Sequence, residues 1–343
     1  MKSRICAFLT LTLLVSGFLF AGGNTESEAG AEAVVEADVV EIVFTTPSGP
    51  GEQHTKSLKV VKEYIDSHAD GRMTFIYHHS GSLFSQDQEL PATIKGNVTM
   101  SYTDASWLGD YMSSIKMFSA GYIFTGPDHM DRVLNGEIGD ELFEQVAAEV
   151  GVRPLSAYYM GSRTINLRQE EPAMTPADLK GIKLRMPNSE TWLFLGKALG
   201  ANPVPIDWGE LYTSLQTGAV DGQDNPLPGI KEGKFYEVTK SISLTNHVVG
   251  AVWPCINEEV WQSLDSDLQK ILVDAFEAGR MQNDSAVKAA EAALVAEFEA
   301  EGLTVVVPDI EAFKTTVNAY YLNDADFTKD WDMDLFNKIK NNG

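Results

Sequence analysis

Apolar and polar residues alternate along this chain with two distinct periods. Four runs have the two-residue alternation and the β-branched content of strands: VEIVFTT, MTFIYHHS, VTMSYTD and GIKLRM. Between such runs, residues 54–71 and 189–200 carry apolar residues at helical spacing, and each segment ends on a glycine. Strands that alternate with helices favour an α/β fold with mostly parallel sheets flanked by helices.

A long helical tract from Asp265 to Glu301 contains few helix-breaking residues. Its apolar positions, among them Leu272 and Phe298, suit a helix that lies across the body of the protein. The tract is longer than a typical globular helix. We therefore expect a kink or a break near Gly279.

The N-terminus has the pattern of an export signal. Residues 1–23 combine a short positive start, an apolar core and a small-residue cleavage site. A membrane anchor is the competing interpretation, but the apolar core is short of the about 20 residues that a spanning helix needs. Residues 24–40 are small and acidic and predict a flexible leader. The body that follows is long enough for two lobes.

The charge balance narrows the possible partners. The chain has 26 basic and 49 acidic residues, a formal net charge of −23 at pH 7. Such a surface disfavours nucleic acid and anionic membranes as partners. An anionic ligand would therefore need positive groups placed locally in its binding site.

The chain lacks the sequence motifs of common enzymes and metal sites. It contains no His-Glu-x-x-His pattern, no Gly-x-Ser-x-Gly elbow and no Gly-x-Gly-x-x-Gly fingerprint. His78 and His79 are adjacent in a predicted strand, so their side chains point to opposite faces. Cys255 lies in an apolar run and is expected to serve packing. We expect no cofactor, no metal and no catalytic residue.

Arg185 is the most informative charged residue. In GIKLRM it stands on the face opposite the apolar set, and Pro187 ends the strand just after it. Ligands bind open α/β sheets at the carboxyl ends of strands, and a guanidinium grips a carboxylate with two parallel hydrogen bonds. A surface ion pair with one of the many acids explains the residue equally well.

A longer segment resembles the extracytoplasmic solute-binding proteins of tripartite ATP-independent periplasmic (TRAP) transporters. Residues 175–247, from TPADLKGIKLRMPNSETW to SISLTNH, carry the resemblance. Residues 81–106 and YYMGSRTINL support it, so that it covers essentially the whole body. The resemblance implies a two-lobed periplasmic binding protein fold with a hinge and a long C-terminal helix across both lobes. We expect lobe I to comprise residues 41–160 and 251–290, and lobe II to comprise residues 161–250 and 291–343.

The resemblance also implies roles for individual residues. Arg185, in the Arg-x-Pro motif, corresponds to the main ligand-carboxylate partner, and Asn225 to the asparagine that hydrogen-bonds the same region. Arg163 matches a second arginine, although Arg168 is a rival because Glu170 and Glu171 look like an insertion. Asn188 follows the motif proline and is a plausible second contact.

Further candidates come from aromatic and polar positions. Trp208 corresponds to an aromatic that packs on the solute, with core packing as its alternative. Asp104 matches a polar position that faces the cleft, with an ordinary strand-end cap as its alternative. The weaker candidates are Ser85, Gln86, Trp107 and Thr46.

The resemblance implies a periplasmic binding protein that closes on an organic acid and delivers it to membrane permease subunits. A sugar acid such as a uronate is the expected solute, a C4-dicarboxylate is the runner-up, and a monomer is expected. An exported enzyme that acts on anionic sugars, using Asp104 and a cleft histidine, is the alternative class. A carbohydrate-adhesion module is a third, but repeats and aromatic clusters are not evident.

Overall fold

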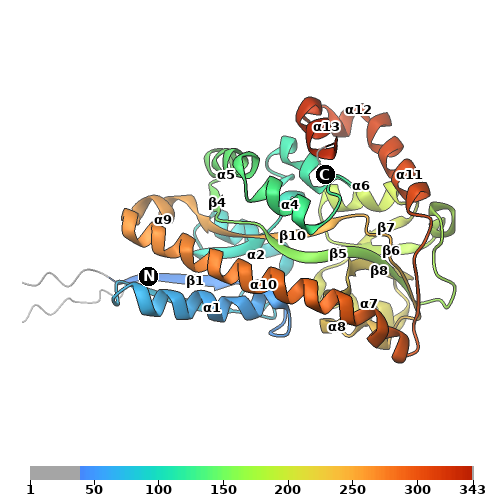
Figure 1. Cartoon of the computed structure of the whole chain (residues 1–343), viewed down its shortest axis with the longest axis horizontal. Helices are drawn as coiled ribbons and strands as arrows, with labels where there is room; N and C mark the ends of the chain where they lie inside the picture. Colours follow the sequence, from blue (N-terminus) through green and yellow to red (C-terminus); the bar gives the residue numbers. More distant parts are fainter. Residues whose placement is uncertain (1–38, 342–343) are drawn as a thin grey trace, which may run out of the picture. The chain divides into compact units, whose positions relative to one another are not determined.

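The computed structural model describes residues 39–341, which form a mixed α/β body (Figure 1). The predicted signal and nearly all of the predicted leader lie outside these residues, although Val40, assigned to the leader, already begins the first strand. The strands are β1 (Val40–Thr45), β2 (Met73–His78), β3 (Met100–Thr103), β4 (Val152–Pro154), β5 (Tyr158–Leu167), β6 (Lys183–Met186), β7 (Asn202–Pro205), β8 (Gly222–Pro226), β9 (Ser241–Ser243), β10 (Val249–Asn257) and β11 (Thr304–Val306).

Helices surround the strands, and the predicted α/β class is confirmed. The α-helices are α1 (Gln53–His68), α2 (Gln86–Ile94), α3 (Ala105–Leu108), α4 (Pro127–Leu134), α5 (Glu137–Val150), α6 (Glu190–Ala198), α7 (Leu211–Thr217), α8 (Leu227–Glu232), α9 (Glu258–Ser263), α10 (Ser266–Ala300), α11 (Ile310–Asn323), α12 (Ala325–Thr328) and α13 (Met333–Asn341). The 3₁₀ helices are η1 (Ser113–Ser119), η2 (Pro176–Leu179), η3 (Trp208–Glu210) and η4 (Phe235–Glu237).

The sheet is parallel at its two ends and antiparallel in its middle. Its strand order is β2-β1-β3-β10-β5-β8-β6-β7, and β4, β9 and β11 pair off this path. Strands β1, β2 and β3 are parallel, as are β6, β7 and β8. The long strands β5 and β10 pair antiparallel with each other and with their other neighbours. The sheet is therefore more mixed than the predicted mostly parallel one, because two long strands join the parallel ends.

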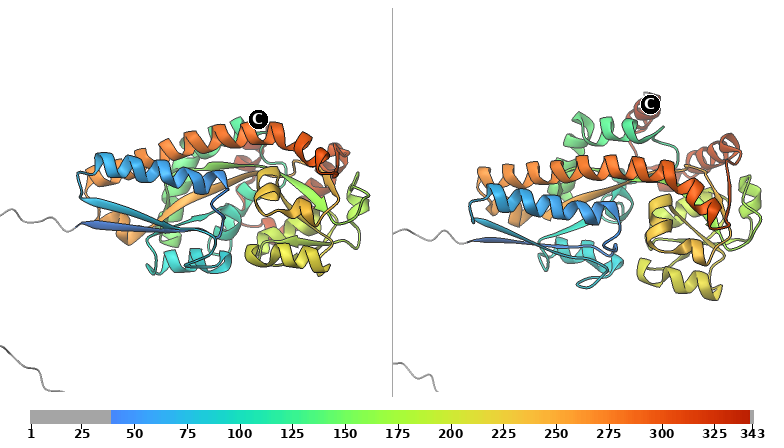
Figure 2. Two further views of the ribbon diagram at one scale, coloured as in Figure 1. Left: turned by 90° about the horizontal axis from the view of Figure 1, so that it is seen from below. Right: turned by 60° about the horizontal axis from the view of Figure 1, so that its bottom comes forward.

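The predicted long helix is present as α10, but the break near Gly279 is absent. The helix runs unbroken for 35 residues and begins at the cap Asp265, whose side chain accepts a hydrogen bond from Leu268 N over 2.9 Å. Figures 1 and 2 show it running beside α1 and onward to the region of α7 and α8. Gly279 has a packing role instead, since a Cβ there would stand 2.7 Å from Tyr158 Oη and 2.9 Å from Val61 Cγ2.

Buried apolar residues form three clusters, all of which α10 touches. One cluster joins β1–β3 and α1 to the first half of α10 through residues such as Phe276. A second joins α7, α8 and β9 to its last turns through Phe298. The third and largest cluster contains Val287 and reaches α11 and α13. Because α10 packs against all three clusters, packing stabilises the helix along its length without a break.

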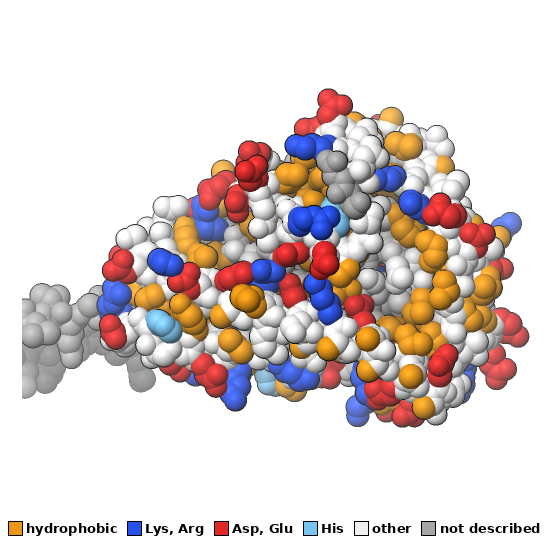
Figure 3. Space-filling view, viewed as in Figure 1, with side chains coloured by type: hydrophobic (Ala, Val, Ile, Leu, Met, Phe, Trp, Pro, Cys, Tyr) orange, Lys and Arg blue, Asp and Glu red, His pale blue; other side chains and the backbone are white. Residues whose placement is uncertain are grey.

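The surface carries its excess of acids dispersed among basic residues. On the face in Figure 3, Asp and Glu side chains are interspersed with Lys and Arg. Several acids are paired, such as Asp66 with Lys62 over 2.9 Å. Within residues 39–341, no helix has the length and apolar character needed to cross a membrane.

Candidate functional site

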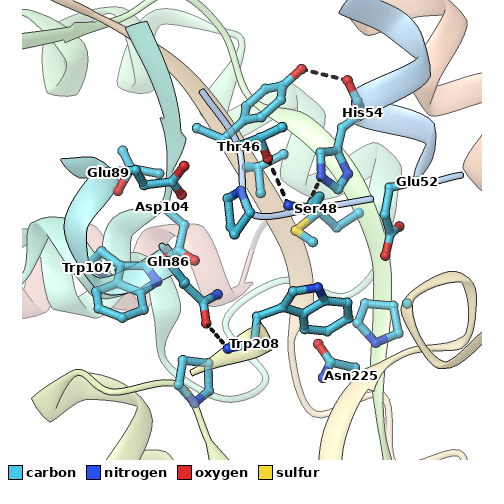
Figure 4. Close-up of a pocket in the computed structure, with 18 of the residues that line it drawn as sticks. Thr46, Ser48, Glu52, His54, Gln86, Glu89, Asp104, Trp107, Trp208 and Asn225 are labelled. Carbon is cyan, nitrogen blue, oxygen red and sulfur yellow. Dashed lines mark hydrogen bonds between the residues drawn. The ribbon is translucent and has the colours of Figure 1, made fainter. Parts of the chain in front are cut away.

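A cavity opens between two stretches of the chain. One wall comes from residues 46–107, which supply the loop after β1, the start of α1, α2, the end of β3, and α3. The other comes from residues 160–229, which supply β5, β6, η3, β8 and α8, and Val252 of β10 completes the lining. Figure 4 shows side chains from both walls facing the same space.

Arg185 lines this cavity from the carboxyl end of β6. The strand lies between β7 and β8, so Arg185 is fully buried, and its strand partners are Val204 and Gln223. Its Nε donates to the Ile206 carbonyl over 2.7 Å, and its Nη2 donates to Gln86 Oε1 over 3.1 Å.

The charge on Arg185 has no matching carboxylate. Among residues 39–341, its guanidinium forms no salt bridge, and its partners are two neutral oxygens. Burial lowers its pKa to about 10, so the group stays protonated at neutral pH. A buried, charged guanidinium that contacts no carboxylate is a strong site for an anion.

Arg163, by contrast, is already neutralised by Asp224. Its Nε donates to Asp224 Oδ2 over 2.8 Å and its Nη2 to Oδ1 over 3.0 Å. His247 Nε2 lies 3.2 Å from the same carboxylate, and Arg163 stacks on the Trp192 ring at 4.2 Å. Burial alone would raise the pKa of Asp224, but Arg163 and His247 outweigh it and hold that pKa well below its ordinary value. The cavity face of Arg163 therefore offers hydrogen-bond donors with little net charge.

Asn225 and Trp208 stand on the same wall as the arginines. Asn225 donates to Gln223 Oε1 over 2.5 Å, and its Oδ1 accepts from Arg163 Nη2 over 3.2 Å. Trp208 packs edge-to-face on Phe235 at 5.3 Å. Its ring also lines the cavity, so both interpretations of Trp208 describe its position.

Gln86 connects the two walls. Besides the bond from Arg185, its Oε1 accepts a hydrogen bond from Trp208 N over 3.2 Å. The dashed line from Gln86 to Trp208 is visible in Figure 4. This residue, a weaker candidate from the sequence, thus takes a central place in the cavity.

Asp104 lies opposite the arginines at the end of β3. It caps α3, since its Oδ1 accepts from Ser106 N over 2.6 Å and from Trp107 N over 3.2 Å. Burial raises its pKa, and these two hydrogen bonds and Arg163 offset only part of the rise. Cap and cavity wall are therefore both correct descriptions of Asp104, and Trp107 beside it also lines the cavity.

The loop after β1 brings residues that sequence reasoning missed. Thr46, a weak candidate, is buried in the wall beside Ser48, whose Oγ lies 2.8 Å from His54 Nε2. Burial lowers the pKa of His54 to about 4, so the imidazole is neutral. Burial and the charge of Glu232 raise the pKa of Glu52 to about 7.

Glycine lets this loop reach α8. Gly51 N donates to Glu232 Oε1 over 3.0 Å. A Cβ on Gly51 would stand only 1.7 Å from Glu232 Oε2, so no larger residue fits there without a shift. The glycine-rich segment SGPGEQH directly after a strand was the available signal for this wall.

Three sequence candidates lie elsewhere. Asn188 is exposed and donates to Asp87 Oδ2 over 3.0 Å, because Pro187 turns the chain out of the cavity. Ser85 is the N-cap residue of α2 and faces a separate surface hollow with Asn188. Arg168 packs near Gly218 and is absent from the cavity lining. Of the two rival arginines, the structure places Arg163 in the cavity.

Comparison with known proteins identifies the family. A family model described as bacterial extracellular solute-binding protein, family 7, matches residues 44–326. The solved structure of a TRAP periplasmic solute binding protein from Roseobacter denitrificans, with bound 3-deoxy-D-manno-oct-2-ulosonic acid, is 36% identical with a TM-score of 0.85. That match covers 89% of this chain and 100% of the other.

Two further relatives agree with this result. The structure of a second Roseobacter denitrificans TRAP protein, with bound L-galactonate, is 27% identical with a TM-score of 0.79. That match covers 84% of this chain and 95% of the other. The sialic acid-binding periplasmic protein SiaP of Vibrio cholerae is 30% identical over 271 residues, 79% of this chain and 84% of the relative. The chain therefore belongs to family 7 of the bacterial extracellular solute-binding proteins, the TRAP solute-binding family.

Proposed function

We propose that this chain captures an organic acid in the periplasm and delivers it to the membrane permease subunits of a TRAP transporter. A sugar acid such as a uronate is the solute that the cavity suits best. The observation that carries this proposal is the buried guanidinium of Arg185, which faces the cavity without a carboxylate partner. The relatives that bind 3-deoxy-D-manno-oct-2-ulosonic acid, L-galactonate and sialic acid support the same class of solute.

In this proposal the ligand carboxylate pairs with Arg185. The fork of Arg163, together with Asn225, supplies further donors to the same end of the ligand. Trp208 gives an apolar surface for the carbon skeleton of the solute. Asp104, Thr46 and the neighbouring groups of the opposite wall accept hydrogen bonds from its hydroxyls.

We propose further that the two walls belong to two lobes that close on the solute. The lobes are residues 41–160 with 251–290, and residues 161–250 with 291–343. Two of the apolar clusters support this division, since each draws its members from one lobe only. The long strands β5 and β10, which pass between the lobes, are the proposed hinge. The hydrogen bonds of Gln86 to Arg185 and Trp208 would then act across the cleft.

A thermal-shift screen of the purified protein tests the function. Uronates, aldonates, 2-keto sugar acids and C4-dicarboxylates are compared with neutral sugars of the same size. An acid that binds only the native state raises the unfolding midpoint by mass action. We expect a rise with at least one sugar acid and none with neutral sugars. A response to neutral sugars alone would refute the role of Arg185.

Recovery of the ligand separates binding from catalysis. His54 and Asp104 both line the cavity, which is what the enzyme alternative requires. After incubation with the protein, the released acid should have an unchanged mass and chromatographic retention. A product that accumulates with time would contradict the proposed binding function and indicate an enzyme.

A further inference from the structure

Positive and negative groups lie on opposite walls of the cavity. The lining carboxylates, Glu52, Glu89 and Asp104, all come from the wall of residues 46–107. The two guanidiniums, of Arg163 and Arg185, come from the wall of residues 160–229. A solute that spans the cavity therefore meets cationic donors at one end and acidic acceptors at the other.

The cationic wall holds one unmatched charge. Asp224 forms two hydrogen bonds with Arg163 and compensates it, whereas Arg185 contacts only neutral oxygens. One carboxylate on the solute is enough to balance this wall. A second carboxylate would have no unmatched cation among the residues that line the cavity.

The acidic wall contains a carboxylate without partners. Glu89 is only 6% exposed, and its Oε2 is buried with no hydrogen-bond partner among the described residues. It lies one turn after Gln86 on α2, so the two side chains share the helix face that lines the cavity. Figure 4 shows Glu89 next to Asp104 at the edge of the cavity.

The hydroxyl of Thr103 on the same wall is also buried without a partner. Buried polar groups in native proteins are normally hydrogen-bonded, so unpartnered ones that line a ligand cavity indicate groups of the ligand. The carboxyl oxygens of Glu89 are therefore available to accept hydrogen bonds from a ligand. Burial, Asp207 and Asp104 all raise the pKa of Glu89, because a negative charge is disfavoured on this wall.

We propose that Glu89 is a specificity-determining residue that selects acids with one carboxylate and hydrogen-bond donors at the opposite end. Hydroxyl groups of the solute donate to Glu89 and Asp104 while its carboxylate pairs with Arg185. A second carboxylate at the hydroxyl end would face two buried acids and is excluded by repulsion and desolvation. This inference rests on the proposed function and decides between its two solute classes, sugar monoacids and dicarboxylates.

Matched acids test the inference by isothermal titration calorimetry at pH 8. D-Gluconate is compared with D-glucarate, and D-galactonate with galactarate, so that each open-chain pair differs only at one terminal carbon. D-Glucuronate and D-galacturonate are added as monoacids that are mainly pyranose rings. The monoacid 3-deoxy-D-manno-oct-2-ulosonate extends the set, and cyclohexanecarboxylate provides one carboxylate without hydroxyls. We expect at least one sugar monoacid to bind on the order of 100-fold more tightly than its diacid, with cyclohexanecarboxylate weaker still.

The variant Glu89→Gln isolates the residue. It keeps the size of the side chain, cannot ionise and places amide donors on the acidic wall, so the preference for the monoacid over the diacid should fall by about tenfold or more. Glu63→Gln, on the exposed face of α1, is the matched control and should leave the preference unchanged. Thermal unfolding of each variant shows that it is folded.

The outcomes separate this inference from the proposed function. A diacid that binds the unaltered protein as tightly as its monoacid overturns the inference and leaves the binding function intact. A folded Glu89→Gln variant with an unchanged preference overturns the role of Glu89. If none of these acids binds, the inference and the proposed sugar-acid function both fail.

Discussion

Gln86 and Arg185 are separated by 99 positions in the sequence, yet the guanidinium of one donates to the amide oxygen of the other over 3.1 Å. The same oxygen accepts from Trp208 N. A single amide of α2 thus holds the main candidate for the carboxylate partner and the aromatic beside it.

Loss of this amide should shorten the lifetime of the complex. Gln86→Ala removes two hydrogen bonds that join the cavity walls, each worth about 1 kcal/mol in net terms. We expect affinity for the bound acid to fall by about 30-fold, chiefly through faster dissociation. Stopped-flow measurement of both rate constants checks this, and a change confined to association would contradict it.

Arg185 should dominate affinity. Arg185→Ala leaves the solute carboxylate buried without its charge partner, a loss that typically costs about 2–5 kcal/mol. Arg185→Lys should also weaken binding, because an ammonium lacks the planar two-point grip. Calorimetric titration gives both values. Arg168→Ala, which alters an arginine outside the cavity, should bind normally, and equal losses in both alanine variants would remove the basis for the site.

Asp224 should matter for stability more than for solute contact. Asp224→Asn leaves Arg163 buried without its counterion, and removal of one partner of a buried pair costs about 3–5 kcal/mol. Because the pKa of Asp224 is depressed in the folded state, its contribution is present at neutral pH and is lost as pH falls below the ordinary aspartate range. Urea unfolding at pH 7 measures the loss. Asp66→Asn, at an exposed pair, should change stability by less than about 1 kcal/mol.

Ionisation of Glu52 should lower the free energy of unfolding as pH rises. Burial and the charge of Glu232 raise the pKa of Glu52 from an ordinary value of 4.5 to about 7 in the folded protein, so folding disfavours the ionised form. The penalty is absent below the unfolded pKa, grows as pH rises through this interval and is complete above pH 7. Glu52→Gln should therefore stabilise the ligand-free protein by on the order of 3 kcal/mol at pH 8, and little at pH 4.5. Unfolding curves at both pH values test the sign, with Glu63→Gln as the control.

Gly279 should not tolerate a side chain. Alanine usually stabilises a helix relative to glycine by about 1 kcal/mol, but here its Cβ would stand 2.7 Å from Tyr158 Oη. We expect Gly279→Ala to destabilise the protein by about 1–3 kcal/mol. In a Tyr158→Phe background the cost should shrink, since the nearest clashing atom is gone. An equal loss of stability in both backgrounds would show that Tyr158 is not the clashing residue, and Val61 is the next nearest side chain.

Local patterns predicted the elements better than their arrangement. The strand that carries Arg185 and the tract that became α10 were visible as periodic runs with clear ends. The antiparallel course of β5 and β10 was not, because strand direction depends on pairing between distant segments. The expected break at Gly279 followed a general rule on helix length that close packing against Tyr158 overrides.

The site was predicted where a residue type dictates its chemistry. A guanidinium before a proline at a strand end indicated an anion site, and Arg185 does line the cavity; its contact with a solute stays a prediction. Glu89 and His54 were missed, because a helix or loop residue gives no sign of which neighbour it will face. Asn188 was expected to contact the ligand, but it is exposed and donates to Asp87, because Pro187 turns the chain out of the cavity.

Helix α10 contributes Phe276, Val287 and Phe298 to three separate apolar clusters. Melting the whole of this helix would expose apolar surface in all three clusters, so the cost of that opening would approach that of complete unfolding. The clusters should therefore lose their structure together. In a calorimeter, the protein should therefore show a single cooperative unfolding transition, even though its two proposed lobes move relative to each other.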